Sequence, residues 1–254
     1  MQEIDGQVRA TPPLLRALNE RAVLDVIRRA APISRAEVAR QSGISKPTVS
    51  SALRALLDAG ERNPRAGILA PRLELPSGET QHSVYAFPTI PFTARFNLGF
   101  HRRVGDRLCL EGFWDPSRER DVDWAIGAFL LVRRAAWDAA GGFDQGQWMY
   151  AEDLDLGWRA ARAGWSTRYV PSARVLHHAS AATTQAWGDE RTLRWLRSTY
   201  AWMLRRRGLI RTRITAAINV AGAYARARNP YFRMWGGLHR RAGFAPRREL
   251  EGHS

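Results

Sequence analysis

The sequence is poor in cysteine, because its 254 residues include only Cys109. A single cysteine cannot form an intrachain disulfide, and a reducing compartment fits this composition. Long apolar runs are missing too, since no stretch reaches the roughly 18 residues of a membrane-spanning helix. The N-terminus lacks the basic and then apolar segments of a secretory signal peptide. These absences predict a cytoplasmic protein that could still bind peripherally to the inner membrane face.

Lysine is almost absent as well: Lys46 is the only one, and every other basic residue apart from the histidines is arginine. The net charge is +15, and residues 191–254 hold most of it, with 15 arginines against two acidic residues. A uniform preference for arginine reflects codon composition as much as function, so charge alone does not indicate nucleic-acid binding. The hydrophobic fraction of 45% is sufficient for one large domain or two small ones.

The first 60 residues contain the pattern of three short helices. Apolar residues at helical spacing predict a helix over residues 13–30, and a capping box at Ser34–Glu37 predicts the start of a second. After Gly43, Ser45 can cap a third helix, and this arrangement is typical of a helix-turn-helix. The third helix would present five polar residues to the major groove and the phosphates: Ser45, Lys46, Thr48, Ser51 and Arg54.

The run ISRAEVARQSGISKPTVSSALRALLDAG belongs to a stretch, residues 15–60, that resembles the N-terminal winged helix-turn-helix of ROK-family transcriptional repressors. The apolar spacing, the cap, the glycine and the Ser-Lys-Pro-Thr-Val-Ser run all agree with that family. The resemblance implies duplex DNA as a partner of residues 34–60. The alternative is a small helical bundle that makes no contact with DNA.

The segment that follows is irregular until about residue 120. We expect a short strand over residues 68–75, broken by Pro71, between two turns rich in proline and glycine. Residues 80–115 contain prolines and aromatics without clear periodicity, and they predict a long loop with short pieces of structure.

Residues 121–178 carry the most consistent local signals. They predict an apolar strand over residues 125–132, a short helix over residues 134–140 that ends at Gly141-Gly142, and a strand over residues 167–176. Between them, an acidic helix is expected to open near Ala151. Strands and helices with acidic residues and histidines at their ends are typical of an α/β enzyme; these residues are Glu152, Asp153, Asp155, His177 and His178.

Several phrases of residues 61–190 resemble the C-terminal half of family-2 glycosyltransferases, the rhamnosyltransferase-like members in particular. They are NPRAGILAPRL, GETQHSVYAFP, VDWAIGAFLLVRR, GGFDQGQWMYAEDLDLGWRAARAGW and VPSARVLHH, and they occur in the order of that family. The resemblance implies part of an α/β, GT-A-type domain. It also implies inverting transfer of a sugar from a nucleotide-sugar donor to a cell-envelope glycan or glycolipid.

Inverting transfer requires a carboxylate that removes the proton from the attacking hydroxyl, and a cation that stabilises the leaving diphosphate. By resemblance, Asp153 is the general base and Glu152 supports it or contacts the acceptor. His177 would join a site for Mg²⁺ or Mn²⁺. Three residues would line the acceptor pocket: Trp124, Gly127 and Ala128.

Each assignment has a structural alternative. Trp124 could belong to the core, and His178 is better explained as a structural histidine than as a ligand. Asp155 and Arg159, at i,i+4 spacing, could form only a surface ion pair. Leu154, Trp158 and Ala161 are expected in the core.

The family's nucleotide-binding half, with its metal-binding Asp-x-Asp, has no counterpart here, because the helix-turn-helix pattern occupies its place. The strings Asp121-Val-Asp123 and Asp153-Leu-Asp155 do occur, but the first does not follow an apolar strand. Residues 153 and 155 would point to nearly opposite sides of a helix. The change of pattern at Gly60 and Glu61 indicates a fusion of two partial genes. We therefore expect an incomplete transferase domain, or alternatively a ROK-like DNA-binding regulator fused to an inactive remnant.

The C-terminal tail is predicted as basic amphipathic helices over residues 191–207 and 210–226. Arginines together with Trp195, Trp202 and Trp235 suit an anionic membrane surface, which residues 191–240 could contact. The alternative is that these helices cover the catalytic domain. The sequence thus divides into a helix-turn-helix (residues 1–60), a partial transferase domain (61–190) and a helical tail (191–254).

Overall fold

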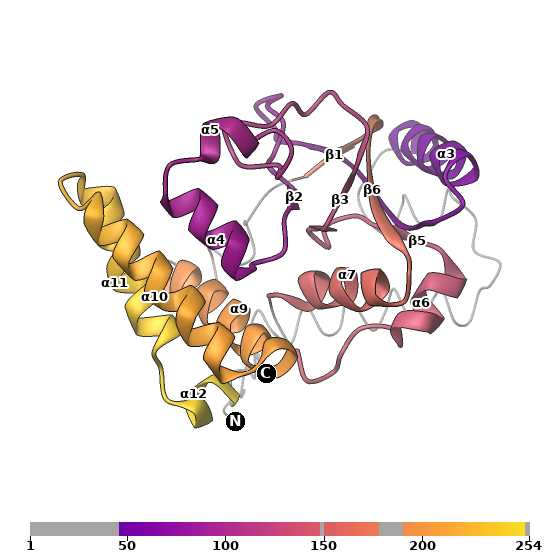
Figure 1. The fold of residues 1–254 in the computed structure, drawn as a ribbon. Helices are drawn as coiled ribbons and strands as arrows, with labels where there is room; N and C mark the ends of the chain where they lie inside the picture. The colour runs from indigo at the N-terminus through magenta and orange to yellow at the C-terminus, as the bar shows by residue number, and fades with distance from the viewer. Residues whose placement is uncertain (1–45, 148–149, 178–189, 252–254) are drawn as a thin grey trace, which may run out of the picture.

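The computed structural model describes residues 46–147, 150–177 and 190–251 (Figure 1). Mixed strands and helices confirm the predicted α/β class. The first two helices of the predicted helix-turn-helix, together with Ser45 and His178, lie outside these residues.

The main sheet has four strands in the order β3-β6-β1-β5. The two central strands, β1 (Ala66–Glu74) and β6 (Ser166–Leu176), are parallel, and β3 (Arg120–Val122) and β5 (Leu131–Val132) pair with them antiparallel. The prediction that Pro71 breaks the first strand was wrong. The strand continues, and its pairing with β6 shifts register between Pro71 and Arg72, because a proline has no N–H to give the ladder.

A second, two-stranded sheet joins β2 (Val84–Tyr85) to β4 (Trp124–Ala125). The single strand predicted over residues 125–132 was therefore wrong, because β4 and β5 belong to different sheets and residues 126–130 connect them. The segment predicted as a long loop contains α4 (Ile90–Asn97), which Thr89 caps, and the short α5 (His101–Val104).

Helices cover both faces of the main sheet. Alternate side chains of β1 point to opposite faces, so Leu69 and Leu73 pack against α3 (Lys46–Arg62). Ile68 packs on the other face against α6 (Arg134–Ala140) and α7 (Glu152–Arg162). Gly141 ends α6 with a φ of 75°, as the predicted glycine stop requires.

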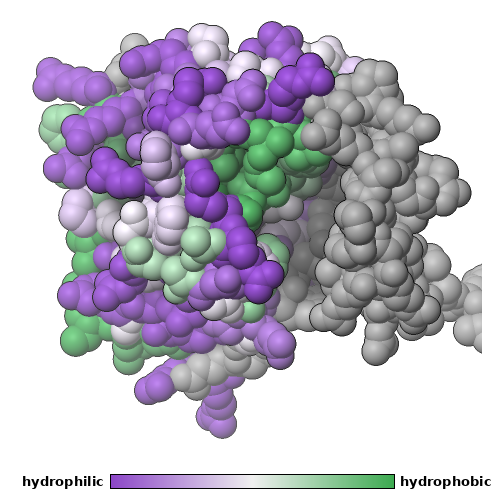
Figure 2. All heavy atoms as spheres, turned by 90° about the vertical axis from the view of Figure 1, so that its right-hand side faces the viewer, coloured by the Kyte–Doolittle hydropathy of each residue, from purple (hydrophilic) through white to green (hydrophobic). Residues whose placement is uncertain are grey.

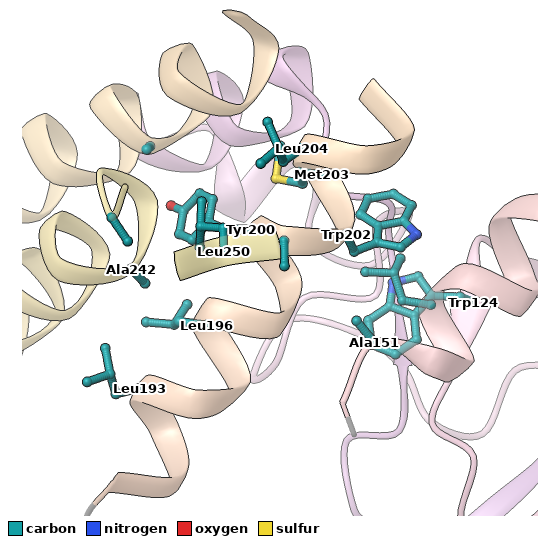
Figure 3. Packing of buried hydrophobic residues seen from close by; sticks show 14 residues of the cluster. Trp124, Ala151, Leu193, Leu196, Tyr200, Trp202, Met203, Leu204, Ala242 and Leu250 are labelled. Carbon is teal, nitrogen blue, oxygen red and sulfur yellow. The ribbon is translucent and has the colours of Figure 1, made fainter. Parts of the chain in front are cut away.

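Four helices at the C-terminal end pack together beside the sheet: α9 (Arg191–Arg207), α10 (Leu209–Ala225), α11 (Pro230–Gly243) and α12 (Arg247–Glu251) (Figure 1). Buried residues of α9 form a core cluster with α7 and β4, and Trp202 lies beside Ala151 and Trp124 (Figure 3). These helices therefore cover the α/β part, as one of the two alternatives predicted. None of the helices among the described residues has the length and apolar character that a membrane crossing requires.

On the side of the molecule that carries α3 and α6, the part that is not covered by grey atoms is mostly hydrophilic, with hydrophobic atoms near the middle of the view and along its left edge (Figure 2). Arg54 of α3 and Arg134 of α6 are both exposed.

Candidate active site

Asp153 lies in the first turn of α7, where its carboxylate faces the connection between β4 and β5. Its Oδ2 accepts a hydrogen bond from the backbone N–H of Gly127 at 2.9 Å, and its Oδ1 accepts one from Leu154 N–H at 2.7 Å. Asp153 is partly buried, whereas Gly127 and Ala128 are exposed. The carboxylate is therefore held in place from one side and reachable from another.

Burial raises the pKa of the Asp153 carboxyl above its usual range, although the hydrogen bonds from Gly127 and Leu154 act in the opposite direction. A raised pKa makes the carboxylate a stronger base. General bases work best when their pKa lies near the working pH, so this shift suits proton removal from a hydroxyl. Glu152, partly buried in the same turn, adds a second acidic group to this helix end.

The backbone in front of α7 is strained. Tyr150 and Ala151 have φ angles of 59° and 63°, in the left-handed region that residues other than glycine seldom adopt. Two such residues in succession have a conformational cost, and strained backbone is concentrated at functional sites. Ala151 is buried against Trp202 and Trp124, and this packing holds the strained turn in place (Figure 3).

The break between β4 and β5 exposes the small residues of the predicted acceptor pocket. A Cβ at Gly127 would lie 3.6 Å from the Cβ of Asp153, so this position forms the wall next to the carboxylate. A continuous strand would have paired the Gly127 N–H within a sheet. The connection instead leaves this N–H free to bind Asp153.

Trp124, which the sequence placed either in the acceptor pocket or in the core, is buried. Its ring stacks on Tyr85 with centroids 4.7 Å apart, and its Nε1 donates to Ala86 O at 3.3 Å. A Cβ at Gly157 of α7 would lie only 2.8 Å from Trp124 Cβ, so β4 and α7 approach closely at this glycine. Trp124 thus positions the wall beside Asp153. Burial raises the pKa of the Tyr85 hydroxyl, and the nearby acidic groups Glu111 and Asp153 raise it further.

Asp155 points to the opposite side of α7 and is fully buried. Its carboxylate accepts hydrogen bonds from Arg159 Nε (2.7 Å), Arg206 Nε (2.7 Å) and Trp202 Nε1 (2.9 Å). Burial acts to raise the pKa of Asp155, but the hydrogen bonds from Arg206 and Arg159 outweigh it and hold the pKa below its usual value. The alternative of a simple surface ion pair was therefore wrong, because α9 covers this side of the helix.

Sequence reasoning missed Arg206 and Trp202 as partners of Asp155. Both lie about 50 residues further along the chain. Only the arginine-rich face of the predicted helix over residues 191–207 could have suggested a cationic partner, and it did not identify which arginine.

His177 lies at the end of β6, where its Nδ1 is 2.6 Å from Gln81 Oε1 and its N–H donates to Glu74 O at 2.8 Å. The carboxylates of the Asp121-Val-Asp123 string lie toward the start of β6, at the opposite end of the strand from His177, and both have other partners. Asp121 pairs with Arg168, and Asp123 accepts from Phe87 N–H at 2.6 Å.

Across residues 46–147, 150–177 and 190–251, no three side chains of His, Cys, Asp or Glu come together as a metal site. The second Asp-x-Asp string cannot chelate one ion either, since Asp153 and Asp155 face opposite sides of α7. The described residues therefore do not fit the Mg²⁺ or Mn²⁺ that the resemblance implies.

The predicted DNA-reading helix, α3, has one face buried and one exposed. Ala52, Leu56 and Ala59 pack on the sheet, whereas Ser51 and Arg54 are exposed. Lys46 and Thr48 lie in the first turn of α3. The exposed face is thus available on the outside of the α/β part.

Comparison with known proteins assigns two segments. Residues 16–60 match the family described as winged helix-turn-helix DNA-binding, although the ROK-type assignment within that class stays a prediction. The chain is 37% identical over 179 aligned positions to an N-acetylglucosaminyl-diphospho-decaprenol L-rhamnosyltransferase of Mycobacterium tuberculosis, covering 59% of this chain and 54% of that protein. It is also 34% identical over 128 positions to the rhamnosyltransferase WbbL of Escherichia coli, covering 50% of this chain and 46% of that protein.

The chain thus spans about half the length of the curated relatives that it matches. Residues 112–239, just over half of the chain, match the description glycosyl transferase family group 2, and this segment contains the carboxylate at the start of α7 and the exposed glycine beside it. The chain belongs to glycosyl transferase family group 2.

Proposed function

We propose that this protein takes part in inverting transfer of a deoxyhexose, of the L-rhamnose type, from a nucleotide-sugar donor to a lipid-linked saccharide of the cell envelope. The acceptor hydroxyl approaches Asp153 along the exposed side formed by Gly127 and Ala128. The observation that carries the proposal is the Asp153 carboxylate, which Gly127 orients and burial makes more basic. The relatives named for rhamnosyl transfer support the type of sugar and acceptor.

The chemical step assigned to this chain is removal of one proton. As the acceptor oxygen forms its bond to the anomeric carbon of the sugar, its proton passes to Asp153 and the bond to the diphosphate breaks. Gly127 N–H holds the carboxylate in place, and Trp124 with Tyr85 keeps the adjoining wall rigid. Glu152 is assigned a supporting role in the same helix turn. Enzymes of this family commonly use a divalent cation, but no step described here depends on one.

The test is transfer by the full chain, with a nucleoside diphosphate L-rhamnose donor and an N-acetylglucosaminyl-diphospho-polyprenol acceptor in the presence of Mg²⁺. Asp153→Asn is expected to lower the rate by about 100-fold to 10,000-fold, the range attributed to general base catalysis. Asp138→Asn is the matched control, because Asp138 is an exposed carboxylate on α6 and should leave the rate unchanged. Equal rates for wild type and Asp153→Asn would refute the assignment.

Donor binding is measured separately, because the chain covers only about half of each relative. The donor should raise the melting temperature of the full chain, and that of Asp153→Asn to the same extent. No shift with any donor, together with no transfer, would count against an autonomous enzyme.

A second function is supported by the match of residues 16–60 to DNA-binding proteins and by the exposed Ser51 and Arg54. We expect the full chain to bind duplex DNA with an affinity that falls as salt rises. Arg54→Ala should reduce the slope of log affinity against log salt by about 1, whereas Arg134→Ala, which removes an exposed arginine of α6, should not. An identical slope for both variants would contradict DNA contact through α3.

A further inference from the structure

An apolar cavity of about 320 Å³ lies among α4, α9, α10 and α11, outside the candidate active site. Its volume is at the lower end of the range of about 300–1,000 Å³ that is typical of small-molecule sites. The walls are mainly aromatic and aliphatic, including Pro88, Phe92, Phe96, Trp195 and Met203. Such a site fits an apolar chain rather than a sugar.

Four polar side chains of the cavity wall bind one another or a neighbour, whereas Thr215 Oγ1 and Trp235 Nε1, also in the wall, are buried without a hydrogen-bond partner among the described residues. The Tyr200 hydroxyl lies 2.9 Å from His239 Nδ1 and accepts from Asn219 Nδ2 at 3.2 Å. Asn97 donates to Asn219 Oδ1 at 3.0 Å and accepts from Arg226 Nη2 at 2.8 Å. Burial lowers the pKa of His239 to about 4, so this histidine is neutral at physiological pH. Arg226, also 4.4 Å from the centre of the Phe232 ring, is therefore the one charged side chain among the residues that line the cavity.

A short piece of chain connects this cavity to the candidate active site. Tyr85 of β2 pairs with Trp124 of β4, three residues before Gly127, whose N–H donates to Asp153. Pro88, three residues after Tyr85, lines the cavity. Three residues span at most about 11 Å even when fully extended. A ligand with a polar head near Asp153 could therefore place its apolar part in the cavity.

Arg207 lies along this connection. Its Nη1 donates to Pro88 O at 3.3 Å, and its guanidinium is 5.3 Å from the centre of the Trp158 ring of α7. No acidic side chain in the described ranges pairs with Arg207, in contrast to Arg206 one residue earlier. A guanidinium without a carboxylate partner, beside an apolar cavity, suits the phosphate of an amphiphile.

We propose that the cavity binds the first part of the isoprenoid chain of a lipid-linked acceptor, and that Arg207 binds the adjoining phosphate. This inference rests on the proposed function for its choice of an isoprenoid rather than another apolar chain. It assigns the C-terminal helices a role in acceptor binding, and it assigns Asp153 to the other end of the same ligand.

The binding experiment uses the full chain and farnesyl phosphate, a short soluble isoprenoid phosphate, with tryptophan fluorescence as the readout because Trp195 and Trp235 line the cavity. We expect saturable binding of farnesyl phosphate and weaker binding of farnesol, which lacks the phosphate. Inorganic phosphate alone should not bind at these concentrations. Absence of saturable binding by farnesyl phosphate would overturn the proposal.

Two variants separate the chain subsite from the phosphate subsite. Thr199→Phe fills the cavity from a partly buried position of α9 and should weaken the binding of both farnesyl phosphate and farnesol at least 10-fold. Thr192→Phe, on the same helix but outside the cavity, should leave both affinities unchanged. Arg207→Gln should abolish the preference for farnesyl phosphate over farnesol, whereas Arg211→Gln, one turn further on and exposed, should preserve it. Affinities unchanged by Thr199→Phe, or a preference unchanged by Arg207→Gln, would refute the corresponding subsite.

Two further measurements keep this inference distinct from others. Dihexanoyl phosphatidylglycerol should not displace farnesyl phosphate; equal displacement would show a general phospholipid site and overturn the isoprenoid assignment.

In the transfer assay, Thr199→Phe should raise the KM for the polyprenyl acceptor at nearly constant kcat, unlike Asp153→Asn. Loss of transfer in Asp153→Asn with an unchanged KM in Thr199→Phe would refute the cavity while the proposed reaction stands. Saturable binding of farnesyl phosphate without any transfer would refute the proposed reaction while the cavity assignment stands.

Discussion

The two sides of α7 carry carboxylates in opposite electrostatic environments, although Asp153 and Asp155 lie in the same helical turn. Within the described ranges, Asp153 accepts hydrogen bonds from backbone N–H groups alone, and burial raises its pKa. Asp155 receives two guanidinium groups and an indole N–H, and its pKa is lowered. The side that faces the open connection thus carries a carboxylate with a raised pKa, whereas the carboxylate that faces α9 is neutralised and fixed by cationic partners.

If the proposed role of Asp153 is correct, this difference assigns catalysis to one side of a single helical turn and stability to the other. A buried carboxylate that accepts hydrogen bonds from arginines can stabilise the native state, since removing one partner leaves the others buried without compensation. A carboxylate that is desolvated without a cation is unfavourable for folding and is retained where its basicity is used. The following changes test whether the two sides differ in this way.

The largest effect on stability is expected for Asp155→Asn. Trp202 and Arg159 would keep buried or largely buried donors without the charge that they bind, whereas the exposed Arg206 would retain Asp144 as a partner. The free energy of unfolding should therefore fall by about 3 kcal/mol, the lower end of the range for breaking a buried ion pair. Urea denaturation measures this loss. Asp138→Asn is the matched control, since Arg134 and Asp138 form an exposed pair at the same i,i+4 spacing on α6. If both variants were equally stable, the buried network would be no more than a surface ion pair.

A smaller loss is expected for Trp202→Phe. The change keeps most of the aromatic ring of a fully buried side chain but removes the Nε1 donor to Asp155, a hydrogen bond to a charged group that is worth about 1.5–3 kcal/mol. Trp195→Phe, on the same helix at a partly exposed position, should change the unfolding midpoint far less. A stability unchanged by Trp202→Phe would show that Arg159 and Arg206 alone satisfy Asp155.

The smallest effect has the opposite sign. The raised pKa of Asp153 means that the folded state binds its proton more tightly than the unfolded state does. Its contribution to stability is therefore present below the unfolded pKa and is lost as the pH rises through the folded pKa. Asp153→Asn should consequently raise the melting temperature at neutral pH, and this gain should shrink as the pH is lowered toward 4. A lower melting temperature for Asp153→Asn at neutral pH would place Asp153 with Asp155 as a stabilising residue.

The local signals of residues 121–178 predicted most of the elements around the site. The glycine stop after α6, the acidic opening of α7 and the strand before His177 are all formed as expected, because each depends on neighbours in sequence. Asp153 was singled out from its motif, and its role as general base stays a prediction. The break between β4 and β5 was not predicted, because an apolar run has the same appearance whether it pairs in one sheet or in two.

The position of α3 shows a similar limit. Its sequence pattern predicted a helix with an apolar stripe, and the helix is present. The stripe could have packed within a helix-turn-helix alone, but Ala52, Leu56 and Ala59 cover one face of the transferase sheet. A hydrophobic stripe shows that a helix has a partner and does not specify which one.

The sequence by itself determined the family, the α/β class, the helix that begins at Glu152 and the carboxylate proposed to act in catalysis. These features depend on residue identity, on spacing and on capping, all of which are local. Only the tertiary structure decided which carboxylate would be free and which would be neutralised, because the partners of Asp155 come from α9, about 50 residues away. It also decided that α4, α9, α10 and α11 enclose an apolar cavity, since a cavity is formed by the side chains of several helices and by no single one of them.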